Sequence, residues 1–256
     1  MTPARFKKTI WDYYRAHGRH DLPWRHTKDP YAILVSEIML QQTQVGRVKI
    51  YYEKFLKKFP NFKSLARAKK EDVLRLWQGL GYNRRALALW KLSKIVLERF
   101  NGKLPRTRGK LESLQGVGPG TSGALMAFAF NTPDVFIETN IRRVFIHFFF
   151  PFRKASQKKH KKVTDETLER YIKATLDRKD PRKWYWALMD YGAMLGNAGN
   201  NSNRKSVQYK KQSPFVGSNR EIRGKLLRSI LAGNKPDLKS VRSRRVFAAL
   251  KKEGFI

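Results

Sequence analysis

The chain has 256 residues, enough for one sizeable domain or two small ones, and 41% of them are hydrophobic, which supports a packed core. Lysine and arginine number 55 against 20 aspartate and glutamate, so a formal charge of +35 attracts polyanions, nucleic acid first and an acidic membrane surface second. The absence of cysteine excludes disulfides, thiolate-bound clusters and a cysteine nucleophile.

No apolar run reaches the ~18 residues of a membrane span, and residues 1–8 lack an apolar signal segment. We therefore expect an intracellular protein, in the cytoplasm or nucleoid, without a membrane partner. Apolar residues recur with helical spacing and strand-like alternation is nearly absent, which predicts an all-α protein. The expected helices span 4–16, 30–44, 45–58, 83–99, 120–130, 140–149, 164–176, 182–195 and 220–231. The charge run 158–162 is interpreted as a solvated loop.

The helix expected from residue 30 carries a single charge, Glu37. Asp29 is suited to cap its start, and Pro30 to occupy its first turn. Aliphatic neighbours such as Leu34 and Leu40 would strip water from Glu37 and raise the pKa of its carboxyl. Glu37 would then keep a proton near neutral pH and act as a general acid. A salt bridge with one of the many arginines is the alternative.

A glycine-rich turn is predicted at Leu114-Gln115-Gly116-Val117-Gly118-Pro119-Gly120-Thr121. A helical stretch from about 107 to 113 precedes it, and a second helix follows, with Pro119 in its first turn. The first N–H groups of that second helix, together with its dipole, form a site for a phosphate. A plain corner between two helices is the alternative interpretation.

A second carboxylate, Glu138, stands where an extended run enters the helix expected from residue 140. Glu138 or Thr139 can cap that helix, whose free N–H groups and dipole favour an ionised carboxylate. An anion at this place suits an oxocarbenium-like sugar, as in glycoside hydrolysis. A purely capping role is the alternative.

Four motifs in order along residues 5–195 resemble the DNA repair glycosylases of the helix-hairpin-helix (HhH-GPD) superfamily, and within it the MutY-like adenine DNA glycosylases. The motifs are Leu22-Pro23-Trp24-Arg25 with Ser36 to Val45, Gly79-Leu80-Gly81-Tyr82-Asn83-Arg84-Arg85-Ala86, the glycine-rich turn, and Ala187 to Met194. The resemblance implies a two-lobed glycosylase domain over 1–200, with one lobe at about 28–130 and the other from 1–27 plus 131–200. Residues 201–256 are then a basic helical extension.

The resemblance also implies a role for each matching residue. Glu37 protonates the flipped adenine, which makes the base a better leaving group, and Glu138 stabilises the sugar cation. The base-pocket positions are Trp24, Arg25, Asp190 and Asn140, and the residues that wedge into the base stack are Gln42 and Tyr82. Ordinary aromatic packing is the alternative for Trp24 and Tyr82. In the hairpin, Gly116 to Thr121 grip a DNA phosphate, and the backbone carbonyls of Leu114 and Val117 hold a monovalent cation.

The chain departs from the family pattern at several places. Glu138 replaces the usual aspartate and is one methylene longer, which leaves its reach to C1′ open. Gly120 replaces the lysine that forms a Schiff base in bifunctional relatives, so hydrolysis without a lyase step is implied. Most relatives bind an iron–sulfur cluster through four cysteines, and Gly196 stands where the first of these would be. No iron–sulfur cluster and no other required cofactor is therefore expected. A C-terminal domain that reads 8-oxoguanine is also expected to be missing, which leaves recognition of that base open.

The extension is expected to be helical from Ser218 or Asn219 to about Leu231, and again from Val241 to Leu250. It resembles a truncated winged-helix unit that docks on the glycosylase domain, and a solvated tail is the alternative. Its charges would contact phosphates without reading sequence.

We therefore expect a monofunctional DNA glycosylase of base excision repair that hydrolyses the bond to a mispaired adenine. The expected partner is double-stranded DNA with a mismatched or damaged base, and the protein is expected to be a monomer. Asp190 favours adenine because a carboxylate accepts from an exocyclic amine. One alternative is a thymine or uracil glycosylase that acts opposite guanine, and the other is a non-catalytic binder of distorted DNA.

Overall fold

The computed structural model describes residues 1–151 and 162–256, and within these ranges the regular secondary structure consists of helices, apart from one isolated bridge between Val163 and Ser206. The prediction of an all-α protein is confirmed. Of the charge run 158–162, only Lys162 lies within the described residues, where it is exposed. No described helix is both long enough and apolar enough to cross a bilayer.

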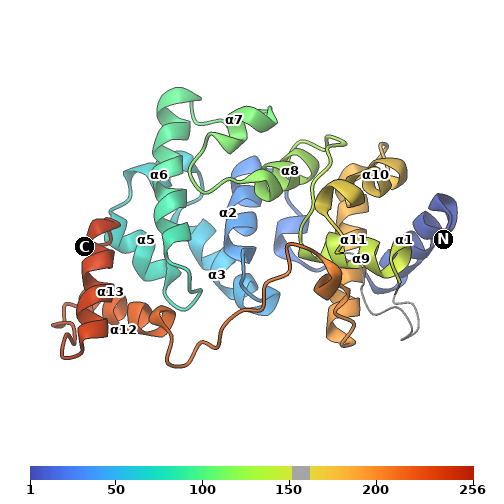
Figure 1. Cartoon of the computed structure of the whole chain (residues 1–256). Helices are drawn as coiled ribbons and strands as arrows, with labels where there is room; N and C mark the ends of the chain where they lie inside the picture. The colour runs from blue at the N-terminus through green and yellow to red at the C-terminus, as the bar shows by residue number, and fades with distance from the viewer. Residues whose placement is uncertain (152–161) are drawn as a thin grey trace. The chain divides into compact units, whose positions relative to one another are not determined.

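The helices follow one another along the chain in an order that can be traced by colour in Figure 1. They are α1 (Pro3–His17), η1 (Pro23–Arg25), α2 (Pro30–Leu40), α3 (Val45–Lys58), α4 (Phe62–Arg67), α5 (Lys70–Trp77), α6 (Arg84–Arg99), α7 (Arg108–Glu112), α8 (Pro119–Phe128), α9 (Thr139–Phe149), α10 (Asp165–Thr175), α11 (Pro181–Asn197), η2 (Ser202–Lys205), α12 (Asn219–Leu231) and α13 (Val241–Lys252). The periodicity did not predict α4 and α5, which are too short to repeat an apolar pattern clearly.

By its internal contacts the chain divides into two compact units. The first comprises Met1–Ile33, Arg106–Ser113 and Val117–Lys210, and the second comprises Leu34–Pro105, Leu114–Gly116 and Lys211–Ile256. The two-lobe boundaries expected from the sequence remain a prediction.

In the first unit, α11 packs along α9, while α1 contacts α11 and α10 contacts α9 (Figure 1). Three aromatic rings form the centre of this packing, because the Phe6 ring lies 5.0 Å from the Phe145 ring and 6.1 Å from the Trp184 ring, centroid to centroid. At Gly192, α11 approaches α9 so closely that a Cβ atom on this residue would lie 2.4 Å from the carbonyl oxygen of Asn140. This contact requires glycine.

Polar side chains of residues 200–205, which follow α11, form hydrogen bonds with α9 and its C-terminal end. Asn200 Nδ2 and His147 Nδ1 are hydrogen-bonded at 3.0 Å, and Asn203 Nδ2 donates to the carbonyl of Thr139 at 3.0 Å. Lys205 Nζ donates to the carbonyl of Phe150 at 2.7 Å. Hydrogen bonds from three side chains therefore hold the segment that follows Gly196 against the rest of the first unit.

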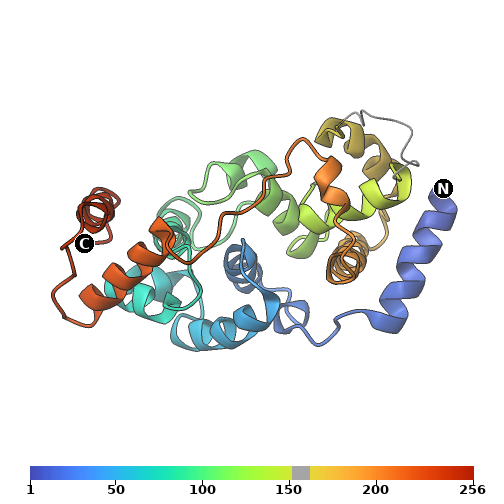
Figure 2. The same cartoon turned by 60° about the horizontal axis from the view of Figure 1, so that its bottom comes forward.

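In the second unit, α6 packs on α4 and α5, and α3 packs on α5 around the fully buried Trp77. The C-terminal helices α12 and α13 pack on each other, and α12 contacts α5 (Figure 2). Ser218 caps α12, accepting from the N–H of Glu221, as the sequence predicts. Residues 211–256 of the basic extension are therefore a packed part of this unit, whereas residues 201–210 belong to the first unit.

Candidate active site

Glu138 caps α9 with its carboxylate. Its Oε1 accepts from the backbone N–H of Asn140 at 2.6 Å and of Ile141 at 2.8 Å, so two donors at the helix start are satisfied. Of the two capping residues that the sequence allowed, Glu138 and Thr139, the structure uses Glu138. The residue as a whole is half-buried.

The carboxyl of Glu138 is subject to opposing effects on its pKa. Burial raises the pKa of its carboxyl, and this effect outweighs the lowering by the N–H groups of Ile141 and Asn140 and by the charges of Arg142 and Arg143. An anion that is poorly hydrated in this way interacts more strongly with a cation brought next to it.

Behind Glu138 lies a chain of hydrogen bonds. Asn140 Nδ2 is 3.4 Å from Glu138 Oε2, and Asn140 Oδ1 accepts from Arg143 Nη1 at 2.8 Å. The same Nη1 donates to the carbonyl of Gly192 at 2.5 Å. Arg143 thus fixes the amide of Asn140 in the orientation that offers its N–H to the carboxylate. No sequence motif indicated Arg143, because its partner at Gly192 is brought there only by the packing of α9 on α11.

Asp190 is buried on α11 and is bound by two arginines. Arg25 donates to both of its carboxylate oxygens at 2.8 Å, and Arg19 donates from Nε at 2.6 Å and from its backbone N–H at 2.9 Å. Although burial alone raises the pKa of Asp190, the hydrogen bonds and charges of Arg25 and Arg19 lower it overall. Asp190 therefore positions Arg25, whose guanidinium also lies 5.3 Å from the centroid of the Trp186 ring. Contact of Asp190 with a base remains a prediction.

Trp24 is buried in η1, two residues after Leu22, and the motif places Arg25 directly beside it. Burial of this kind agrees with a pocket wall and with ordinary core packing alike. Its part in holding a base stays a prediction.

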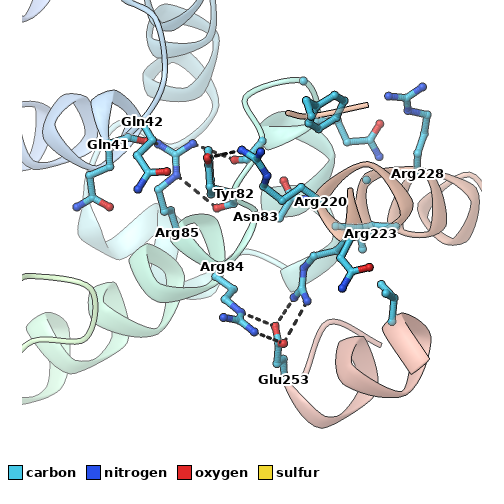
Figure 3. A pocket seen from close by; sticks show the side chains of 18 of the residues that line it. Gln41, Gln42, Tyr82, Asn83, Arg84, Arg85, Arg220, Arg223, Arg228 and Glu253 are labelled. Carbon is cyan, nitrogen blue, oxygen red and sulfur yellow. Dashed lines mark hydrogen bonds and ion pairs between the residues drawn. The ribbon is translucent and has the colours of Figure 1, made fainter. Parts of the chain in front are cut away.

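Arg85 fixes the geometry of the segments that carry Gln42 and Tyr82 (Figure 3). Its guanidinium donates to the carbonyls of Ile38, Met39 and Gln41 at 2.9, 2.8 and 2.5 Å, at the end of α2. It also donates to the carbonyl of Gly81 at 2.9 Å and to Thr43 Oγ1 at 2.9 Å. One side chain thus ties the end of α2 to the loop before α6.

The backbone at both expected wedge residues is unusual. Gln42 has a φ of +57° and Tyr82 a φ of +48°, a region that residues other than glycine seldom adopt. Burial lowers the pKa of the Arg85 guanidinium to about 10, so it stays charged at neutral pH and holds both turns. The sequence held an indication of this role. Arg85 follows the segment Gly79-Leu80-Gly81, and no acidic residue lies near it in the sequence that could pair with its charge.

Glu37 lies in the second half of α2, between the buried residues Ser36 and Ile38, and its own side chain is partly exposed. Asp29 caps the start of this helix, accepting from the N–H of Tyr31 at 3.1 Å and of Ala32 at 3.2 Å, as predicted. Because Arg85 binds the carbonyl of Ile38, the turn that carries Glu37 is held from its C-terminal side.

The hairpin has the predicted form, with α7 before it and Pro119 in the first turn of α8. Gly116 needs its glycine, because its φ is +89° and a Cβ would lie 3.0 Å from that of Ala88. At Gly118 a Cβ would meet no described atom within 4 Å, and at Gly120 only the carbonyl oxygen of Ile137 at 4.0 Å. The fold around these two positions does not require glycine, which favours the approach of an outside group to the start of α8.

The described residues contain no cluster of three or more His, Cys, Asp or Glu side chains that could hold a metal ion. At the hairpin, Leu114 and Val117 are both buried. The implied monovalent cation would be bound by their backbone carbonyls, which are oxygen donors suited to a hard ion.

Residues 35–174 match the family model described as "HhH-GPD superfamily base excision DNA repair protein". The chain is 38% identical over 195 residues to the adenine DNA glycosylase of Buchnera aphidicola subsp. Baizongia pistaciae, which covers 76% of this chain and 54% of that relative. It spans about half the length of the adenine DNA glycosylases of Buchnera that it matches.

A second group of relatives is similar over most of its own length. The thymine/uracil-DNA glycosylase of Pyrobaculum aerophilum is 33% identical over 199 residues, which is 76% of this chain and 84% of that protein. A solved structure of a thermostable thymine-DNA glycosylase superposes with a TM-score of 0.67 at 29% identity, covering 80% of this chain and 92% of that one.

Proposed function

The chain belongs to the HhH-GPD superfamily of base excision DNA repair proteins, and we propose that it is a monofunctional DNA N-glycosylase that removes a mispaired adenine from duplex DNA. The observation that carries this proposal is its 38% identity to an adenine DNA glycosylase over 76% of the chain. The partner is double-stranded DNA with a mismatched or damaged base, bound by a monomer.

Glu37 and Glu138 divide the chemistry. Glu37 gives its proton to a ring nitrogen of the flipped base while the bond to C1′ breaks, and the electron pair leaves with the base. The sugar becomes an oxocarbenium cation, which the Glu138 anion stabilises. Water then adds to C1′ and loses a proton, leaving an intact abasic site. The capping bonds and the Asn140–Arg143 pair support this role, because they hold the Glu138 carboxylate in place.

The hairpin holds one DNA phosphate, and Gly120 offers no amine for an imine, so no lyase step follows hydrolysis. No cofactor is required, and a monovalent cation at the carbonyls of Leu114 and Val117 would stabilise the turn. Strand breaks should appear only after alkali treatment, and borohydride should trap no covalent complex with DNA. Efficient trapping would show that another amine attacks C1′.

A thymine or uracil glycosylase acting opposite guanine is the second candidate. The observation that favours it is the 33% identity to the Pyrobaculum thymine/uracil-DNA glycosylase over 199 residues, together with the similarity of fold to a solved thymine-DNA glycosylase. Asp190 does not separate the two candidates, because Arg25 and Arg19 already donate to both of its carboxylate oxygens.

The deciding experiment is a single-turnover cleavage panel on duplexes that carry each mismatch, uracil opposite guanine, and adenine opposite 8-oxoguanine, developed with hot alkali. Excision of adenine alone supports the first proposal, and excision of thymine or uracil supports the second. In the Glu37→Gln variant, cleavage should fall roughly 10²–10⁴-fold while duplex binding survives. Full activity in that variant would remove Glu37 from the mechanism.

A further inference from the structure

A cavity of about 750 Å³ opens in the second unit between the segment Gln78–Arg85 and the C-terminal helices α12 and α13 (Figure 3). Its charged lining consists of Arg47, Arg84, Arg85, Arg220, Arg223, Arg228 and Glu253. Half of the lining residues lie in the C-terminal segment that follows the residues matched by the family model, so this segment helps to build the pocket.

The lone carboxylate of the lining is already engaged. Glu253 is hydrogen-bonded by both Arg84 and Arg223, and these two arginines lower the pKa of its carboxyl to about 2. The single carboxylate of Glu253 is therefore shared by two guanidinium groups. In the described part of the chain, Arg47, Arg220 and Arg228 have no carboxylate partner.

Arg220 is held at the pocket wall. It donates to the hydroxyl of Tyr82 at 2.9 Å and to the carbonyl of Ser213 at 2.6 Å, and its guanidinium lies 5.9 Å from the Tyr82 ring centroid. Gln212 also donates to that hydroxyl. Phe215 lines the same pocket although its side chain is 58% exposed. Guanidinium groups beside open aromatic rings are a combination suited to a nucleic acid strand.

The spacing of the cations favours a strand over a small anion. Arg220 and Arg228 are eight residues apart on α12, which is about 12 Å along a helix axis. One phosphate cannot bridge that distance, whereas the repeated phosphates of a strand can. Arg47 adds a third cation from α3.

We propose that this pocket binds the backbone of a DNA strand, with phosphates of that strand at Arg220, Arg228 and Arg47, and a base or sugar face against Phe215. The inference rests on the proposed function insofar as duplex DNA is the ligand. It assigns the C-terminal extension a part in holding DNA next to Gln42 and Tyr82.

The test compares two double variants that each remove two positive charges, one from α3 and one from the C-terminal helices. Arg47→Ala with Arg228→Ala alters the pocket, while Lys58→Ala with Arg245→Ala alters exposed residues outside it. Affinity for a fluorescent duplex would be measured by anisotropy over a salt series. The slope of log Kd against log salt should fall by about 2 in the pocket variant and by less than about 1 in the control.

Equal affinities and slopes in the two variants would overturn the pocket. Arg228→Glu, at an exposed position of α12, repeats the measurement should the double variant unfold, and Arg245→Glu is its control. The cleavage panel separates the two proposals. A wild-type protein that binds duplex without excising any base contradicts the glycosylase function alone, while cleavage with indistinguishable variants contradicts the pocket alone.

Discussion

At the scale of single residues, Arg85 is expected to stabilise the second unit through its hydrogen bonds to backbone carbonyls. Arg85→Met should lower the free energy of unfolding by roughly 2–4 kcal/mol, because a buried set of carbonyls loses its charged donor. Urea denaturation measures the loss. Arg75→Met, at an exposed position on α5, is the control and should change stability by less than about 0.5 kcal/mol. A pair of variants with equal stability would mean that water satisfies the Arg85 carbonyls.

Glu138 is the residue whose titration should be visible in the reaction. Because its pKa is raised and the anion is the active form, the single-turnover rate should decline as the pH falls, at a pH above the ordinary glutamate value. Glu138→Gln should lower the rate and remove this acid limb, whereas Glu166→Gln, exposed on α10, should leave both unchanged. Glu138→Asp should shift the rate in either direction, since it moves the carboxylate by one methylene. An unchanged rate in both Glu138 variants would reduce the residue to a helix cap.

The sequence predicted residues that act through local geometry better than those that act through long-range packing. Caps at Asp29, Glu138 and Ser218 depend on N–H groups two or three residues away; Asp29 was predicted outright, and Glu138 and Ser218 were each one of two neighbouring candidates. The pairing of Asp190 with Arg25 joins residues 165 positions apart and could not be read from spacing. A motif places such residues in one site without saying which of them bind each other.

At the scale of elements, the packing of α9 on α11 positions Glu138. Gly192→Ala should force the helices apart, because the added Cβ would lie 2.4 Å from the Asn140 carbonyl, and should cost roughly 1–3 kcal/mol of stability. It should also lower the cleavage rate by displacing Asn140. Gly46→Ala is the matched control, since that Cβ meets no atom within 4 Å on α3 and should stabilise the helix by up to about 1 kcal/mol. Thermal unfolding and single-turnover rates together test this account.

At the scale of the whole molecule, the all-α class and most helices follow from apolar periodicity, because each helix buries one face. The packing of the C-terminal helices on the rest of the second unit could not be predicted from this periodicity. Their sequence shows two amphipathic helices with many cations, but the contact of α12 with α5 depends on surface made by residues more than a hundred positions earlier. The division into two compact units likewise interleaves distant segments, which periodicity along the chain cannot show.

The excess of positive charge makes a prediction for the whole molecule. With a formal charge of +35, and with arginines at the C-terminal pocket that no carboxylate neutralises among the described residues, binding to duplex DNA should release many counterions. For a protein that makes several phosphate contacts, the affinity should fall by roughly 10³–10⁵-fold between about 50 and 200 mM salt.

Fluorescence anisotropy with a fully paired duplex measures the sequence-independent part of the affinity. The same salt series with a mismatched duplex adds the contribution of the flipped base. Because a flipped base is uncharged and adds no phosphate contact, the two lines should run parallel, with the mismatched duplex bound more tightly at every salt concentration. A flat response for both duplexes would remove nucleic acid as the partner, and coincident lines would leave binding without recognition of a mismatch.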